Sequence, residues 1–177
     1  MTTGTTETGT YYFYNKKEQD IPIVFIHGVG LTYEIWQPQL EFFKNYSTLS
    51  YDILGHGKSS LNKDKITFDD FSDQLIDLID HLKIKKIHVV GFSIGSLIAR
   101  NFATKFSDRL KSLTLLCSIY KRSEEQQKIV NERFEQAKKE LKLWKKNDPL
   151  LKLEKNISVI KKNKISNEIL KEINSSF

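Results

Sequence analysis

Cysteine is nearly absent from this sequence, since Cys117 is the only one among 177 residues. A single cysteine excludes an internal disulfide and any metal site built from several cysteines, and it fits a reducing compartment. No base is recognisable beside Cys117, so we predict a small buried thiol at this position rather than a nucleophile.

Long apolar runs and the marks of a signal peptide are also lacking. No stretch approaches the roughly 18 apolar residues that a membrane helix needs. Residues 1–10 are rich in threonine and glycine and have neither a basic start nor an apolar middle. We therefore expect a mobile tail over residues 1–10, a cytoplasmic protein and no membrane partner.

The charge is unevenly distributed along the chain, with a formal net value of +6. Acidic and basic residues balance over residues 1–119, so the whole excess lies in residues 120–177. There the lysines alternate with Leu, Ile and Glu at helical spacing, which is typical of solvated helix faces. We expect no nucleic-acid partner, and a steeply salt-dependent affinity for DNA or RNA would contradict this.

Short apolar runs alternate with amphipathic stretches up to residue 119. This alternation favours an α/β fold with a mostly parallel sheet and helices on both faces. From residue 121 onward the pattern is helical, over residues 130–144 and again over 150–173, without an evident strand. The predicted strands are residues 11–14, 21–26, 46–51, 87–90 and 110–119, and the predicted helices are 35–43, 68–82 with Thr67 as its cap, and 96–106.

A serine between two glycines joins a predicted strand to a helix, in the sequence Gly91-Phe92-Ser93-Ile94-Gly95. This G-x-S-x-G spacing indicates a nucleophile elbow, a turn so tight that side chains at 91 and 95 would meet neighbouring backbone. The turn pushes the Ser93 hydroxyl out above the sheet. The alternative is an ordinary serine that caps the following helix.

A serine hydroxyl attacks a carbonyl effectively when a base removes its proton and N–H donors stabilise the resulting oxyanion. Two backbone donors are predicted here. Ile94 directly follows the serine, and Val29 lies in the loop after the strand at residues 21–26. His27 and Gly28 belong to the same loop, so we expect them to lie close to the substrate.

A second glycine-rich loop, at residues 53–60, superficially matches a phosphate-binding loop. The pattern G-x-x-x-x-G-K-[ST] would need glycine where Asp52 stands, and a carboxylate there would repel phosphate. Nucleotide binding is therefore not expected. Asp52 is instead predicted to bond the backbone of the turn that follows it.

The order of His27-Gly28, the residue 52–59 sequence DILGHGKS and the Gly91 to Gly95 motif resembles the α/β-hydrolase superfamily. Further similarity, in the WQPQ sequence at residues 36–39 and around Arg109, is to the 3-oxoadipate enol-lactonase and small esterase group. Serine rather than aspartate at position 93 argues against the dehalogenase and epoxide-hydrolase branches.

This resemblance implies a role for each part of the chain. Residues 11–120 would form the N-terminal part of the hydrolase core, and residues 121–177 part of a helical cap. Ser93 would be the nucleophile, and Val29 and Ile94 the oxyanion donors. No metal or organic cofactor is implied.

The catalytic base is not recognisable in the sequence. In this superfamily the acid and the histidine follow the serine in chain order, whereas no histidine follows Ser93. His81 and His88 are predicted to be structural, and neither His27 nor His56 is expected to be the base. No triad acid can be assigned. We expect a truncated chain that lacks the last strands, leaves residues 110–119 as an open edge and is inactive alone.

These features predict a serine hydrolase that acts on a carboxylic ester or lactone through an acyl-enzyme at Ser93. Its expected partner is a small-molecule ester or lactone, and the sequence specifies neither the substrate nor the oligomeric state. The alternative is a non-catalytic ligand-binding pseudoenzyme of the same fold, which would keep the elbow without turnover.

Overall fold

The computed structural model describes residues 2–147 except 19, 64 and 120. A six-stranded sheet with the order β1-β2-β4-β3-β5-β6 forms its centre. β3, β4, β5 and β6 are parallel, whereas β2 is antiparallel to both β1 and β4. This confirms the predicted mostly parallel sheet. The strands are β1 (Thr2–Thr5), β2 (Tyr11–Asn15), β3 (Ile23–Ile26), β4 (Thr48–Tyr51), β5 (Ile87–Phe92) and β6 (Leu110–Leu116).

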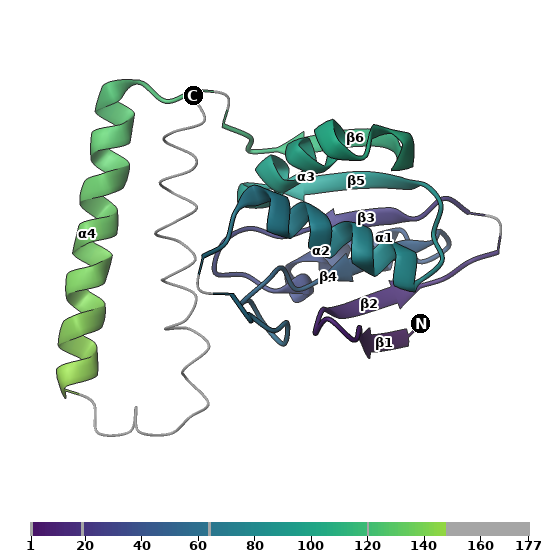
Figure 1. Cartoon of the computed structure of the whole chain (residues 1–177), viewed down its shortest axis with the longest axis horizontal. Helices are drawn as coiled ribbons and strands as arrows, with labels where there is room; N and C mark the ends of the chain where they lie inside the picture. Colours follow the sequence, from purple (N-terminus) through teal and green to yellow (C-terminus); the bar gives the residue numbers. More distant parts are fainter. Residues whose placement is uncertain (1, 19, 64, 120, 148–177) are drawn as a thin grey trace.

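Helices cover both faces of the sheet (Figure 1). On one face, α2 (Phe68–His81) and α3 (Ile94–Lys105) contribute to the main hydrophobic core. On the other face lie the short helices η1 (Tyr33–Trp36) and α1 (Gln37–Phe42), whose Trp36 packs against Phe25 of β3. Successive residues of a strand point to opposite faces, so the continuous apolar run of β3 serves both cores. A further short helix, η2 (Ser107–Arg109), leads into β6.

The N-terminal residues differ from the predicted mobile tail. Thr2–Thr5 form β1, which pairs antiparallel with β2 along its whole length. The connecting turn contains Gly9 in the left-handed region, with φ of 85°. Threonine is β-branched and suits a strand, so a composition that suggests a solvated tail forms an edge strand once β2 offers hydrogen-bond partners.

α2 begins with a reciprocal capping box, which confirms Thr67 as its cap. Thr67 Oγ1 accepts a hydrogen bond from Asp70 N at 3.3 Å, and Asp70 Oδ2 accepts one from Thr67 N at 2.8 Å. Two N–H groups that a helix start leaves unpaired are satisfied in this way. The Thr67→Ala substitution is therefore expected to lower the free energy of unfolding by about 1 kcal/mol, measured by urea denaturation at pH 7.

The Asp70 carboxylate makes part of this stabilisation depend on pH. Burial acts to raise its pKa, but hydrogen bonds from Lys63 and Thr67 outweigh this effect and lower the pKa below its ordinary value. Because the pKa of Asp70 is lower in the folded state than in the unfolded state, its ionised form stabilises the fold above pH 4. This contribution is lost as the pH falls through the folded-state pKa. Asp70→Asn should thus destabilise the protein at pH 7 but not at pH 2. Asp108→Asn, at an exposed position, serves as the control, and an equal loss at both pH values would contradict the assignment.

β6 lies at an edge of the sheet, and no strand in the described part of the chain pairs with its outer side. Leu113, Leu115 and Leu116 are between 36% and 40% exposed, which is unusual for strand leucines. Cys117 follows directly and is exposed, so the prediction of a buried thiol is wrong. The open edge agrees with the prediction for residues 110–119, and Cys117 is exposed because it directly follows this edge strand.

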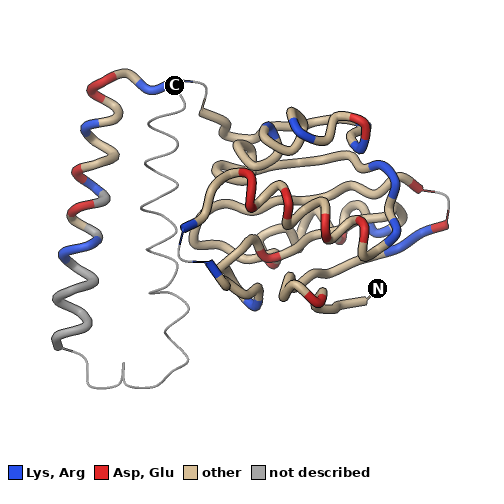
Figure 2. Tube along the Cα trace, viewed as in Figure 1, with Lys and Arg blue, Asp and Glu red and all other residues tan. Residues whose placement is uncertain are grey.

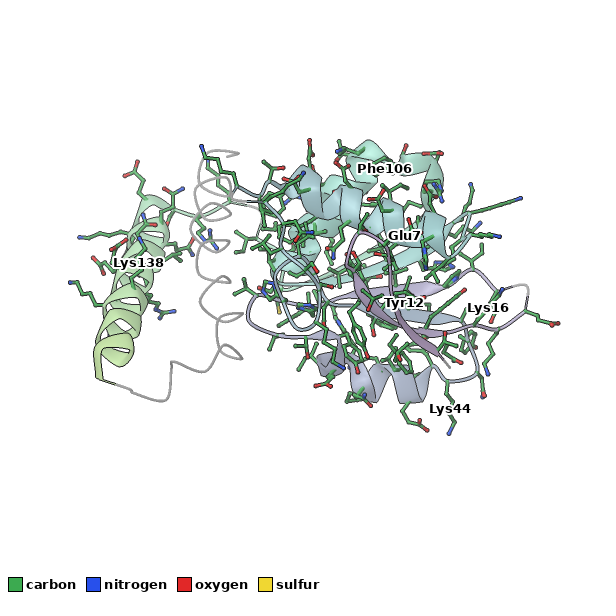
Figure 3. The ribbon with its side chains drawn as sticks, turned by 60° about the horizontal axis from the view of Figure 1, so that its bottom comes forward. Glu7, Tyr12, Lys16, Lys44, Phe106 and Lys138 are labelled. Atoms are coloured by element: carbon green, nitrogen blue, oxygen red, sulfur yellow. The ribbon has the colours of Figure 1, made fainter. Side chains whose placement is uncertain are left out.

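α4 (Glu124–Asn147) lies beyond the carboxyl ends of the parallel strands and apart from the sheet (Figure 1). Figure 3, in which Lys138 marks this helix, shows the same separation from a second direction. It contains the helix predicted for residues 130–144. Basic and acidic residues alternate along its described part, as Figure 2 shows. None of the helices described is long and apolar enough to cross a membrane. The helical segment predicted for residues 150–173 lies outside the described residues.

Candidate active site

Ser93 is the single residue between β5 and α3, which begins at Ile94 rather than at the predicted residue 96. Its backbone has φ of 55° and ψ of −119°, a conformation that residues with a side chain rarely adopt. Such strain costs on the order of 1–3 kcal/mol and persists only where the surroundings enforce it. Here Ser93 N donates a hydrogen bond to Leu116 O of β6 at 2.9 Å, which holds the turn in place.

The two glycines of the motif stand where no side chain fits. A Cβ at Gly91 would lie 2.2 Å from Gly95 O, and a Cβ at Gly95 would lie 2.4 Å from Ile26 O. Both distances are far shorter than a van der Waals contact. The backbone of α3 therefore packs directly against the backbone of β5 and β3, with no room for a side chain between them. The sequence predicts this lack of room at both glycines.

The Ser93 side chain is half-buried and makes no capping hydrogen bond to α3. The interpretation of Ser93 as an ordinary helix cap is therefore not supported. Ser96 N and Ser96 Oγ both donate to Ser93 O, at 2.9 Å and 2.6 Å, so these bonds engage the Ser93 carbonyl and not its hydroxyl. The Ser93 hydroxyl is left at the carboxyl end of β5, in the middle of the parallel strands.

The loop after β3 lies against this junction. A Cβ at Gly95 would lie 2.7 Å from His27 O, and one at Gly28 would lie 3.1 Å from Cδ1 of Phe92. The structure thus brings His27 and Gly28 next to the residues that flank Ser93. Val29, the next residue, is 48% exposed. Ile94 is the first residue of α3, where an α-helix leaves the backbone N–H without an intrahelical acceptor.

His27 is fully buried, and both of its ring nitrogens take part in hydrogen bonds. Ile53 N donates to Nε2 at 3.1 Å, so Nε2 is the acceptor and the proton lies on Nδ1, which is 2.7 Å from Gly28 O. The imidazole therefore connects the loop after β3 to the loop after β4. In this tautomer the side chain positions the backbone and has no nitrogen left to take a proton from Ser93.

The other histidines contact separate parts of the fold. His56 is buried with Nδ1 3.1 Å from Leu54 O, and its ring centroid is 5.4 Å from that of His27. His88 Nδ1 is 2.7 Å from Ser112 Oγ, and His81 packs edge-on against Tyr12. Within the described part of the chain, no group of three His, Cys, Asp or Glu side chains could hold a metal ion.

Asp52 is almost fully buried, and its carboxylate accepts hydrogen bonds from two segments of backbone. The sequence predicts one of these two bonds. Its Oδ2 accepts a hydrogen bond from Lys58 N at 2.8 Å, in the turn that follows it, as expected. Its Oδ1 also accepts one from Tyr33 N at 2.8 Å, at the start of η1. Through Tyr33 the carboxylate fixes the far end of the loop that begins at His27.

Gln74 supports the same region and is not apparent from the sequence. It is buried on α2, where its Oε1 accepts from Leu54 N at 3.0 Å and its Nε2 donates to Asp52 O at 3.1 Å and to Thr10 Oγ1 at 3.2 Å. The only available signal is its position on the apolar face of a helix, between Phe71 and Leu78. A polar residue on such a face is expected to find buried partners.

A parallel sheet whose central strand ends in a strained serine at the start of a helix is the arrangement of the α/β hydrolases. Residues 21–156 match the family described as alpha/beta hydrolase fold, and the chain belongs to this family. The match covers the sheet from β3 to β6 and the candidate site.

Two similar relatives are named as a hydrolase and a lactonase. The (E)-2-((N-methylformamido)methylene)succinate hydrolase of Acinetobacter baylyi is 35% identical over 130 residues, which are 73% of this chain and 49% of the relative. The 3-oxoadipate enol-lactonase 1 of the same organism is 32% identical over 108 residues, 60% of this chain and 40% of the relative. The chain therefore spans half or less of the length of these two relatives.

Solved structures support the fold. MGS-M2, an alpha/beta hydrolase enzyme from a Medee basin deep-sea metagenome library, is similar with a TM-score of 0.70 and 22% identity. The similarity covers 98% of this chain and 71% of that chain.

Proposed function

We propose that Ser93 is the nucleophile of a serine hydrolase that acts on a carboxylic ester or lactone. The observation that carries this proposal is the backbone of Ser93, held at φ of 55° between β5 and α3 with no capping bond from its hydroxyl. Strain of this kind is retained where it serves a site. The enol-lactonase and succinate-derivative hydrolase among the relatives support an ester or lactone as the substrate class.

The proposed reaction proceeds in two steps. Ser93 Oγ attacks the carbonyl carbon while a base accepts its proton, and the carbonyl oxygen becomes an oxyanion stabilised by the N–H groups of Val29 and Ile94. The C–O bond to the leaving group then breaks, and the alkoxide takes up the proton. Water attacks the resulting acyl-enzyme in the same way and releases the acid. The scheme requires no metal and no organic cofactor.

The general base of this scheme cannot be identified among residues 1–177. No histidine follows Ser93, and both nitrogens of His27 are engaged. We therefore expect the chain alone to react slowly with esters. A base added in solution should replace the proton acceptor, because general-base assistance typically contributes 10²-fold or more.

The test is phosphonylation of the 177-residue chain by a neutral fluorophosphonate, with and without imidazole. Intact mass and peptide mapping should locate the adduct on Ser93, and imidazole should accelerate its formation by about 10-fold or more. Ser93→Ala should remove this adduct. Ser107→Ala, at an exposed serine of η2, is the matched control and should change nothing.

Two outcomes would contradict the proposal: no adduct on Ser93 even with imidazole, or equal modification of the Ser93→Ala variant. The first outcome, in a chain that unfolds cooperatively and still binds small esters, would favour the non-catalytic ligand-binding alternative. Rapid Ser93-dependent turnover without imidazole would instead show that a base lies within residues 1–177.

A further inference from the structure

The buried imidazole of His27 joins two loops at the carboxyl ends of β3 and β4. Ile53 N donates to its Nε2 at 3.1 Å, and its Nδ1 lies 2.7 Å from Gly28 O. The side chains of His27 and Ile53 are both fully buried. In the reaction proposed for Ser93 this ring transfers no proton, although histidine is the side chain that changes its charge near neutral pH.

The bond from Ile53 to His27 requires an unprotonated Nε2. The neutral ring has one N–H and one acceptor nitrogen, whereas the protonated ring has two N–H groups and no acceptor. A proton on Nε2 would therefore point one donor at another, the N–H of Ile53, inside the protein. A buried donor without an acceptor is unfavourable, and a buried unpaired charge is more so. Acid should thus favour a state in which His27 has left Ile53.

The titratable neighbours of His27 on the loop after β4 act in opposite directions. The ring centroid of His56 lies 5.4 Å from that of His27, so two protonated rings would repel each other. The carboxylate of Asp52 would attract a cation. Its two oxygens, however, already accept bonds from Tyr33 N and Lys58 N, both at 2.8 Å. A proton on His27 therefore gains little from Asp52 without loss of one of these bonds.

The other elements at this junction present groups that do not titrate. α3 meets the His27 carbonyl with Gly95, since a Cβ there would lie 2.7 Å from His27 O. α2 reaches the loop after β4 with the uncharged side chain of Gln74. The Lys58 ammonium lies 4.4 Å from the centroid of the Tyr11 ring. These contacts stay the same when the pH changes, so the response to acid should come from the two histidines.

We expect the loop after β3 to move, rather than the segment after β4. That segment is also held by α2, because the Gln74 side chain makes hydrogen bonds to its backbone at 3.0 Å and 3.1 Å. The loop after β3 is joined to the segment near its two ends, at His27 and at Tyr33. Between these points Val29 is 48% exposed. Loss of the His27 bond would therefore release the end of the loop that carries the Val29 N–H.

We propose that His27 is an acid-sensitive switch, which holds the loop after β3 closed while its ring is neutral and releases the loop when the ring is protonated. The consequence for catalysis rests on the proposed function of Ser93, because the released loop would carry the Val29 N–H away from the oxyanion. His27 is thus a positioning residue that takes no part in bond breaking. Below about pH 6.5, where a solvated histidine is protonated, each pH unit should favour the open loop by up to about 10-fold.

The test is hydrogen exchange of the 177-residue chain, followed by mass spectrometry of peptides that cover residues 27–35 and 53–60. After correction for intrinsic exchange, the opening constant of these peptides should rise about 30-fold between pH 7.5 and pH 5. His27→Gln should remove this rise, because its amide oxygen can accept from Ile53 N and does not titrate. His81→Gln, at an exposed histidine, is the matched control and should keep the rise.

The opening should be local. The two peptides should therefore exchange faster than β5 at each pH and respond little to low concentrations of urea. Exchange of the loop only at the rate of β5 would mean unfolding of the whole sheet and would overturn the inference. An opening constant that does not change with pH would overturn it as well. So would an acid response that persists in His27→Gln and disappears in His56→Gln, because the titrating group would then be His56.

A second measurement covers the case in which His27→Gln does not fold. Nitrogen NMR of the imidazole rings in the original chain should show His27 Nε2 unprotonated as long as the Ile53 N–H is protected from exchange. A His27 ring protonated at both nitrogens beside a protected Ile53 N–H would contradict the switch.

The outcome for Ser93 is read separately, because hydrogen exchange requires no reaction at this residue. Acid-dependent opening without a Ser93 adduct would remove the proposed nucleophile and leave the switch at His27 standing. A Ser93 adduct together with a loop that does not respond to pH would support the nucleophile and remove the switch.

Discussion

Replacing Gly95 with alanine is expected to lower the free energy of unfolding by about 3 kcal/mol, the upper range for overpacking. The added Cβ would lie 2.4 Å from Ile26 O and 2.7 Å from His27 O, and both atoms belong to backbone that cannot rotate away. Relief requires α3 to move from β3, which would also separate Ser93 from the loop at His27. Urea denaturation should therefore show the stability loss, and the imidazole-assisted adduct on Ser93 should decrease with it.

Gly30→Ala provides the control for this prediction. Gly30 has φ of 75°, but no atom lies within 4 Å of a Cβ placed there. The substitution therefore introduces only left-handed backbone strain, worth about 1 kcal/mol. A Gly95→Ala variant no less stable than Gly30→Ala would show that α3 can withdraw from β3 without loss.

The contrast between these glycines shows which part of the site can be predicted from sequence. The requirement at Gly91 and Gly95 is local, because a two-residue spacing on each side of Ser93 determines how close strand and helix must come. The positions of β5 and α3 follow from the same short stretch. The α/β fold can also be predicted from the sequence, because each strand such as β3 is a run of consecutive apolar residues.

What the sequence did not predict depends on partners far along the chain. β1 exists because β2 presents an edge to a threonine-rich segment. The exposure of Cys117 was not predicted, although the open edge of β6 beside it was, and no strand in the described part of the chain pairs with that edge. The bond from Tyr33 N to Asp52 and the buried role of Gln74 join segments separated by 19 or more residues. Periodicity and motif spacing contain no information on such contacts.

The same distinction applies to catalysis. The nucleophile and its candidate oxyanion donors are tied to one turn and one adjacent loop, so their residues can be named from motifs. A base must reach Ser93 through space, and chain order identifies it only when a histidine follows the serine.

Asp52→Ala is expected to have the largest effect of the substitutions considered, a loss of about 4 kcal/mol of unfolding free energy. The carboxylate is 1% exposed and accepts hydrogen bonds from Tyr33 N and Lys58 N, both at 2.8 Å. Removing it deprives both donors of a charged acceptor, at about 1.5–3 kcal/mol for each bond. Thermal and urea unfolding should both report the loss, provided that the variant still folds at low temperature.

Asp52→Asn separates the two bonds, because one carbonyl oxygen remains as an acceptor while the amide N–H₂ opposes the second backbone donor. We expect this variant to lose about 2 kcal/mol. Asp20→Ala is the matched control, since Asp20 is exposed and accepts a long bond of 3.3 Å from Ser47 N, so it should lose less than about 0.5 kcal/mol. A similar small loss in Asp52→Ala would mean that water replaces the carboxylate. The loop from His27 to Tyr33 would then be positioned by His27 alone, through its bonds to Gly28 O and Ile53 N.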